Sequence, residues 1–138
     1  MFKSLVKPHL FCYAIVPQTI LTGVTANPNI NIANDADFEL LEIRASIHQA
    51  ASATGTLLML LSTSSGDLFS NVAIDLYAIA SAEQDSFSGY PIRLTEPVRI
   101  PANTVLNCQL TNNNSETIES VQVQLWGYKK VEQRKLRD

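Results

Sequence analysis

Three carboxylates stand close together in the first third of the chain. Asp35, Asp37 and Glu39 occupy alternate positions just ahead of an apolar segment. Hard oxygen ligands at such spacing are what Ca²⁺ binds in proteins, so these three side chains are candidate calcium ligands. The segment lacks the glycine and the distant glutamate of an EF-hand loop. A turn of the Asx type that leads into a strand is therefore the alternative interpretation.

Histidine and cysteine, the other residues that commonly do chemistry, are scarce. His9 lies beside a proline near the start of the chain, and His48 closes a predicted strand. We expect Cys12 and Cys108 to be reduced and buried, where a thiol behaves as a small apolar group. No G-x-S-x-G, C-x-x-C, H-E-x-x-H or glycine-rich phosphate motif occurs. The sequence therefore predicts no enzyme activity, no catalytic residue and no cofactor.

The remaining candidate residues are suited to contact with a partner. Trp126 and Tyr128 fall on the outward row of a predicted strand, and aromatic side chains there suit a protein interface or a sugar site equally well. Both chain ends are basic. We predict an interface made by Phe2, Lys3, Lys7, Trp126, Tyr128, Lys129, Lys130, Arg134, Lys135 and Arg137.

Alternation of apolar and polar residues recurs along the chain and predicts strands. In residues 121–128 and 104–111 one row is apolar and is expected to face inward. The inward residues are Val121, Val123 and Leu125 in the first segment, and Leu106, Cys108 and Leu110 in the second. A polar loop at residues 112–116 joins the two segments, so we predict a hairpin.

Two further segments predict strands with special features. Residues 38–47 alternate, with Leu41, Ile43 and Ala45 inward, if the register slips once near Leu40, as in a β-bulge. The continuous apolar run at residues 57–61 predicts a strand buried on both faces, inside the sandwich or beneath another subunit. Residues 72–82 are compatible with a helix or with a coil. Shorter strands are predicted at residues 12–16, 19–24, 29–32, 92–94 and 98–100. Strands at such short spacing indicate a sandwich or barrel.

Length and charge divide the chain into a body and two ends. A length of 138 residues indicates one domain, and a net charge of −3 argues against a typical nucleic-acid binder. Residues 1–128 carry five basic and eleven acidic side chains, whereas residues 129–138 carry five and two. We expect an N-terminal arm at residues 1–11, a β-sandwich domain at residues 12–128 and a basic C-terminal tail at residues 129–138. The tail contains good helix formers and is expected to fray alone.

Segments across the body resemble small β-sandwich virion proteins of tailed bacteriophages, of the head decoration or cement type. The segments are DADFELL at 35–41, GTLLMLL at 55–61, DLFSNVAI at 67–74, YPIRL at 90–94, VRIPANTVL at 98–106, LTNN at 110–113 and VQVQLWGYK at 121–129. The resemblance implies a single antiparallel, jelly-roll-like β-sandwich in an all-β fold. It also implies a structural subunit that stabilises a capsid by bridging neighbouring capsid subunits.

The implied partners are the major capsid protein or other virion proteins and further copies of the chain, commonly as a trimer. The implied location is the virion, assembled in the host cytoplasm, without a sequence-specific nucleic-acid partner. No membrane partner is expected either, because the apolar run at residues 57–61 is far shorter than the roughly 20 residues of a membrane helix.

Three alternatives stay open. Collar, tail and baseplate components share such folds. A carbohydrate-binding jelly-roll module would use Trp126 and Tyr128, with calcium at Asp35 and Asp37. A hydrolase is the third alternative, and no motif in the sequence supports it.

Overall fold

The computed structural model describes residues 3–135 except residues 51 and 83–89, and at residues 3–7, 81–82 and 131–135 it describes the backbone. Strands make up nearly all the regular structure of this part, which confirms the predicted all-β fold. The one helical segment among the described residues is a short 3-10 helix, η1 (Leu76–Ala78). None of the helical structure described is long and apolar enough to cross a membrane.

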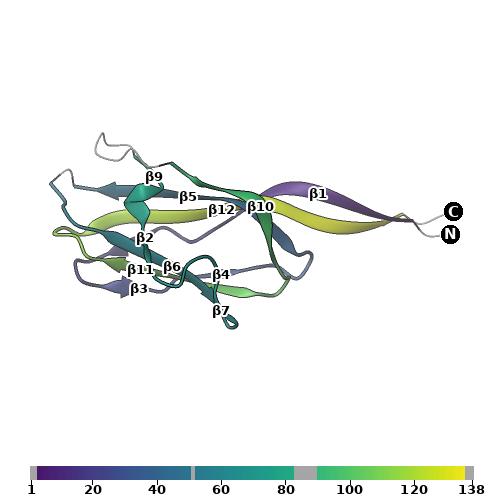
Figure 1. The fold of residues 1–138 in the computed structure, drawn as a ribbon, viewed down its shortest axis with the longest axis horizontal. Helices are drawn as coiled ribbons and strands as arrows, with labels where there is room; N and C mark the ends of the chain where they lie inside the picture. Colours follow the sequence, from purple (N-terminus) through teal and green to yellow (C-terminus); the bar gives the residue numbers. More distant parts are fainter. Residues whose placement is uncertain (1–2, 51, 83–89, 136–138) are drawn as a thin grey trace.

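Two antiparallel sheets face each other (Figure 1). Sheet A contains β1 (Lys3–Ala14), β2 (Gln18–Ile20), β5 (Phe38–Gln49), β9 (Ala80–Ala82), β10 (Ile92–Ile100) and β12 (Ile118–Lys135). Sheet B contains β3 (Thr25–Ala26), β4 (Asn29–Asn31), β6 (Leu57–Thr63), β7 (Gly66–Asp67), β8 (Ile74–Asp75) and β11 (Val105–Asn112). The sandwich predicted from the sequence is confirmed.

The strand order is that of a jelly roll. β1 and β2 both pair with β12 and form one edge strand interrupted near Pro17, which cannot donate to a ladder. β3 and β4 pair with β11 in the same way, and β7 and β8 pair with β6. We count β1 with β2, β3 with β4, and β7 with β8 as one strand each and leave β9 out. Numbered in this way along the chain, the strands lie in the order 1-8-3-6 in sheet A and 2-7-4-5 in sheet B. β9 is an addition that pairs with β5 in parallel.

The core lies between the sheets and is built from the predicted inward rows. Val121, Val123 and Leu125 on β12 are fully buried, as are Leu106, Cys108 and Leu110 on β11. Fully burying one such aliphatic side chain stabilises the fold by about 1.5 to 3 kcal/mol. Alternation therefore directs each of these strands to one side of the core.

The predicted β-bulge in β5 is confirmed and depends on a glycine. Trp126 lies opposite Glu42 and Gly127 lies opposite Leu40, so Leu41 is the extra residue. Leu41 is half-buried, which corrects its predicted inward position, because the bulge takes it out of the alternation. A Cβ at Gly127 would collide with the backbone carbonyl of Glu39. The two strands can approach this closely only without a side chain at position 127.

The predicted hairpin at residues 104–128 is wrong. β11 belongs to sheet B and β12 to sheet A, so the loop between them crosses between the two layers, about 10 Å apart. The buried side chain of Asn112 holds this crossing. Its Nδ2 donates to the carbonyl oxygens of Ile20 at 2.9 Å and Glu116 at 3.1 Å, and its Oδ1 accepts from the Asn114 amide at 2.9 Å. These bonds satisfy one backbone group of β2 and two of the crossing loop.

Other local expectations also need correction. Within one chain the run at residues 57–61 is not buried on both faces, because β6 alternates and leaves Leu58 and Leu60 half-buried on the outer side of sheet B. Burial beneath another subunit, the other alternative, stays a prediction. Residues 72–82 form β8, η1 and β9, so the region is neither one helix nor a coil. Cys12 is half-buried on the outer side of sheet A, whereas Cys108 is buried and both thiols are free.

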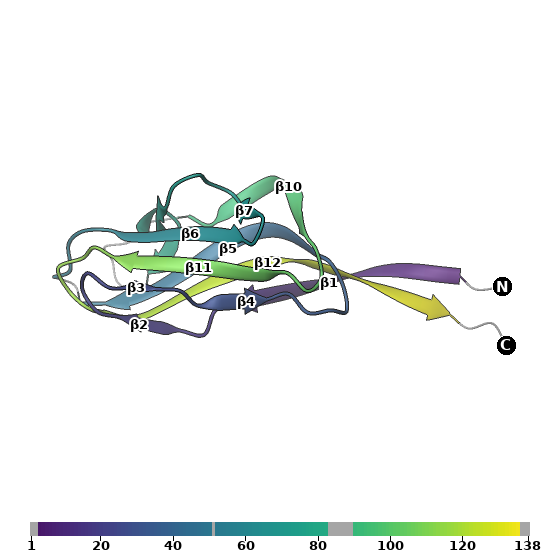
Figure 2. The ribbon, with the colours of Figure 1, turned by 90° about the horizontal axis from the view of Figure 1, so that it is seen from below.

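The predicted arm and tail form one structure. β1 and β12 pair from Lys3 opposite Lys135 to Ala14 opposite Gln124, and both views show them leaving the sandwich together (Figures 1 and 2). β5 ends its pairing with β12 at Lys129. Residues 3–8 and 130–135 therefore make a two-stranded extension, the terminal ribbon. Strand pairing between the two ends replaces the independent fraying tail expected from helix propensity.

Candidate functional site

The candidate calcium ligands are held in separate ion pairs. Asp35 Oδ2 lies 2.8 Å from Lys129 Nζ, and Glu39 Oε1 lies 2.8 Å from Lys130 Nζ. Asp37 accepts from the Arg99 guanidinium and, at 2.9 Å, from the Ala102 amide. Among the described residues, no three His, Cys, Asp or Glu side chains are grouped so as to hold a metal ion. The structure therefore gives no support for a calcium site. A turn at Asn34 and Asp35 leads into β5, in agreement with the alternative interpretation of this segment as a turn before a strand.

Hydrogen bonds also explain the acidity of these carboxyls. The bond from Lys129 lowers the pKa of Asp35, and the bonds from the Ala102 amide and Arg99 lower the pKa of Asp37. Both side chains therefore stay ionised through the neutral range. Together they join the start of β5 to β12 and to the end of β10.

Lys129 is a structural residue, which corrects its predicted place in the interface. It is 8% exposed, and its ammonium lies 4.5 Å from the ring centroid of Phe11 and 5.7 Å from that of Tyr13. The hydrogen bond to Asp35 raises the pKa of Lys129 above the ordinary value of a lysine. The Tyr13 ring packs edge-on against Phe38 in the core, 4.9 Å between centroids. The lysine thus fastens the base of the terminal ribbon to the sandwich.

The terminal ribbon presents unpaired strand edges. Each of its strands has one neighbour within the described chain, namely the other strand. Its sequence is basic, with Lys3, Lys7, Lys130, Arg134 and Lys135 against one acidic residue. Lys130 is exposed and bound to Glu39. Two other predicted interface residues, Phe2 and Arg137, lie outside the described residues.

Trp126 and Tyr128 lie on the outer face of sheet A, as predicted, but they do not offer a free stacking platform together. The guanidinium of Arg44 lies 5.6 Å from the centre of the Trp126 ring, and the indole N–H donates to Gln124 at 3.0 Å. Gln124 in turn donates to Gln122 at 2.9 Å. These contacts engage the Trp126 ring and its N–H, so the exposed Tyr128 is the member of the pair left to stack on a sugar ring.

The two histidines cannot belong to one catalytic site. His9 is exposed at the base of the terminal ribbon opposite Lys129, and His48 lies opposite Ser120 at the other end of β12. Half of the His48 side chain is exposed, and its Nε2 lies 3.3 Å from a Glu119 carboxylate oxygen. Burial raises the pKa of Cys108 to about 12, which keeps it an unreactive thiol.

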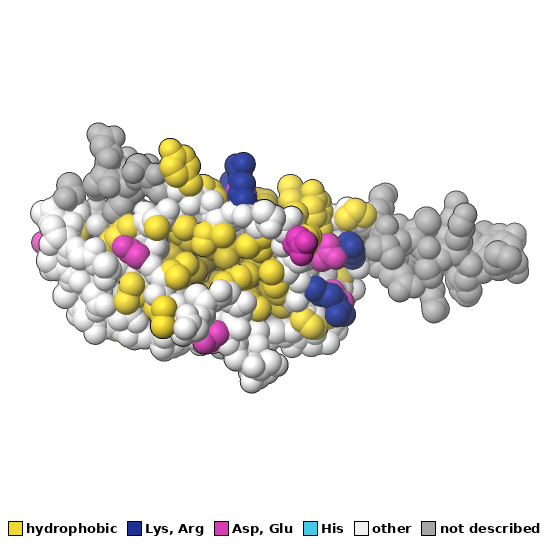
Figure 3. Space-filling view, in the orientation of Figure 1, with side chains coloured by type: hydrophobic (Ala, Val, Ile, Leu, Met, Phe, Trp, Pro, Cys, Tyr) yellow, Lys and Arg dark blue, Asp and Glu magenta, His cyan; other side chains and the backbone are white. Residues whose placement is uncertain are grey.

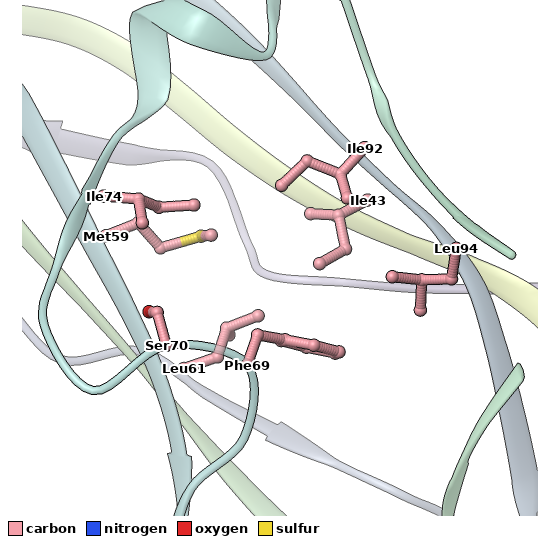
Figure 4. Close-up of a pocket in the computed structure, with 8 residues that line it drawn as sticks. All are labelled: Ile43, Met59, Leu61, Phe69, Ser70, Ile74, Ile92 and Leu94. Atoms are coloured by element: carbon pink, nitrogen blue, oxygen red, sulfur yellow. The ribbon is translucent and has the colours of Figure 1, made fainter. Parts of the chain in front are cut away.

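An apolar slot opens on one long side of the sandwich, and sequence reasoning missed it. It has a volume of about 270 Å³ and lies where β10 departs from β5 and where the β7–β8 loop folds over β6 (Figure 4). The slot is lined by Ile43, Met59, Leu61, Phe69, Ser70, Ile74, Ile92 and Leu94. Hydrophobic side chains gather in the middle of this side of the molecule (Figure 3). The lining comes from four strands and a loop, so no local pattern could have indicated it.

Comparisons with protein families, with curated proteins and with solved structures found no match. The evidence for function therefore comes from the geometry of the chain itself. That geometry offers surfaces for contact: a basic ribbon with open edges, an apolar slot and the two outer sheet faces.

Proposed function

We propose that this chain is a non-enzymatic structural subunit of a virion, which binds the shell and bridges neighbouring subunits. The observation that carries the proposal is the terminal ribbon. A two-stranded ribbon that leaves its own sandwich has no internal core, and isolated two-stranded ribbons are marginally stable in water. A neighbouring subunit that pairs with its edges or packs on its faces would stabilise it.

Two further features support this function. Jelly rolls are common in viral capsid proteins, although fold analogy by itself assigns no site. The ribbon is basic in a chain that is otherwise acidic. A neighbour with an acidic surface would therefore attract the ribbon and repel the body of the chain. Repetition on a symmetric lattice would multiply weak contacts of this kind. The finer role within this proposal is capsid decoration, with the collar, tail or baseplate as the alternative location.

The test is mass spectrometry of purified particles from the source, with copy number referenced to the major capsid protein. Hundreds of copies in each particle are expected for a decorating subunit. A dozen or fewer would move the chain to the collar, tail or baseplate, and complete absence would overturn the proposal.

A truncation tests the role of the ribbon. Deletion of residues 131–138 keeps Lys129 and Lys130, whose ion pairs belong to the sandwich. We expect the truncated protein to fold and to lose most of its binding to particles that lack the native subunit. Binding equal to that of the full chain would contradict the role of the ribbon.

A further inference from the structure

The backbone of the terminal ribbon shows which groups of its two strands bond to each other. The N–H of Ile15 donates to the carbonyl oxygen of Val123 at 3.1 Å. These two residues directly follow the register pair of Ala14 with Gln124, and the register of β1 with β12 is unbroken from there to the end of the ribbon. In an antiparallel pair, hydrogen-bonded and non-bonded positions alternate. The odd-numbered residues of β1 and β12 therefore bond across the ribbon, and the even-numbered residues direct their N–H and C=O groups away from it.

A proline agrees with this assignment and distinguishes the two edges. Pro8 lies opposite Lys130, an even-numbered pair, so its nitrogen is on the open edge of β1, where a missing N–H costs no bond within the ribbon. The same proline interrupts that edge for an incoming strand. On β12, the pairing with β5 ends at Lys129, and the even positions beyond it include Glu132 and Arg134, both with an N–H. The open edge of β12, in line with β5, is therefore uninterrupted.

The charge of the ribbon favours one class of strand for this edge. Five basic residues and one acidic residue lie in its two strands, so an acidic strand is attracted. The ribbon of a second copy carries the same charge and is repelled. A nucleic acid would match the charge, but it would leave the alternating N–H and C=O groups without the partners that a strand provides.

We infer that an acidic, extended segment of a neighbouring protein adds as a strand to the open edge of β12. It bonds to the outward N–H and C=O groups of Glu132 and Arg134 and continues the line of β5. The inference rests on the proposed function, since it specifies how the neighbouring subunit holds the ribbon. The added strand converts a two-stranded ribbon into a three-stranded sheet, which is more stable in water.

The experiment measures the binding of the full chain and its variants to purified particles that lack the native subunit. Glu132→Pro removes the outward N–H and leaves the bonds to β1 in place. We expect binding to be about ten-fold weaker or more, because a carbonyl oxygen of the added strand loses its donor. Glu132→Gln makes the same change of charge but keeps the N–H. It should tighten binding, because it removes the acidic side chain of the ribbon.

Val6→Pro is the matched control for damage to the ribbon itself. Val6 lies directly opposite Glu132, and its N–H is directed to the open edge of β1. The two proline variants alter the ribbon at the same level, but Val6→Pro spares the edge of β12 and should bind as the unchanged chain does. Circular dichroism and thermal melting check that each variant is folded. Equal losses in the two proline variants, or no loss in Glu132→Pro, would overturn the inference, while binding of the unchanged chain would still support the proposed function.

Two further conditions test the class of partner. Raising the salt concentration from about 0.05 M to about 0.5 M should weaken the binding of the unchanged chain, because salt screens the attraction between opposite charges. Binding that salt leaves unchanged would overturn the acidic partner. Loss of binding after nuclease treatment of the particles would assign the ribbon to a nucleic acid and would also overturn the inference. Failure of the unchanged chain to bind would contradict the proposed function, and the inference with it.

Discussion

Lys129 Nζ lies 2.8 Å from Asp35 Oδ2, although 94 residues separate the two in sequence. The lysine is almost fully buried, and half of the aspartate side chain is exposed. This pair joins the turn before β5 to the base of the terminal ribbon. The sequence suggests Asp35 as a metal ligand and Lys129 as an interface contact, whereas in the structure the pair helps to hold the sandwich together.

The pair predicts how stability depends on pH. Lys129 lowers the pKa of Asp35 below its ordinary 3.8, so its stabilising contribution is complete above that value and is lost as the pH falls through the folded-state pKa. Asp35 raises the pKa of Lys129 above 10.5, so that contribution is present below 10.5 and is lost as the pH rises through the folded-state pKa.

Asp35→Asn should therefore destabilise the protein at pH 7 and reduce the loss of stability on acidification. Urea unfolding at pH 7 and at about pH 3 measures both effects. The exposed Asp67, which has no ion-pair partner among the described residues, provides the control Asp67→Asn. Equal behaviour of the two variants would contradict a special role for the pair.

Gly127→Ala should destabilise sheet A strongly. The new Cβ would meet the backbone of Glu39 and Leu40, and backbone cannot yield as a flexible side chain can. We expect a loss of about 3 kcal/mol or more in the free energy of unfolding, at the upper end of overpacking costs. Gly23→Ala is the control, because Gly23 has a φ of 78° but nothing within 4 Å of its Cβ position. A loss of about 1 kcal/mol is expected there. A smaller loss at Gly127 than at Gly23 would contradict the close-approach argument.

Asn112→Ala tests the crossing between the sheets. The substitution removes two donated bonds and one accepted bond from a fully buried site, which should cost about 1 to 3 kcal/mol or more. The neighbouring Asn113 is exposed and uses its backbone amide to reach Thr56, so Asn113→Ala should change stability by less than about 0.5 kcal/mol. Chemical denaturation of the two variants provides the comparison, and similar losses in both would refute the role of the Asn112 side chain.

The two thiols should differ in reactivity. Burial raises the pKa of Cys108 to about 12 and also raises the pKa of Cys12, which is less deeply placed. In native protein at pH 8, iodoacetamide should modify Cys12 slowly and leave Cys108 unmodified, and in urea it should modify both. Peptide mass spectrometry locates the label. Labelling of native Cys108 at the rate seen in urea would show that its strand opens readily.

Local patterns predicted the inward rows, because side-chain direction in a strand follows from an alternation of two residues. The rows of β11 and β12 and the slip in β5 needed no knowledge of distant residues. The hairpin prediction failed because alternation does not say which sheet a strand joins. That choice depends on Asn112 and on pairing between β12 and β5, which lie far apart in sequence.

The sequence by itself determined the all-β class, the composition of each strand and the acidic body with basic ends. Only the tertiary structure decided that the two ends pair as a ribbon, that Asp35, Asp37 and Glu39 each meet a cation, and that β11 and β12 belong to different sheets. The physical reason is the distance along the chain over which each effect acts. Propensity and alternation act over a few neighbouring residues, whereas strand pairing and ion pairs depend on which distant segments the folded chain brings within a few ångströms.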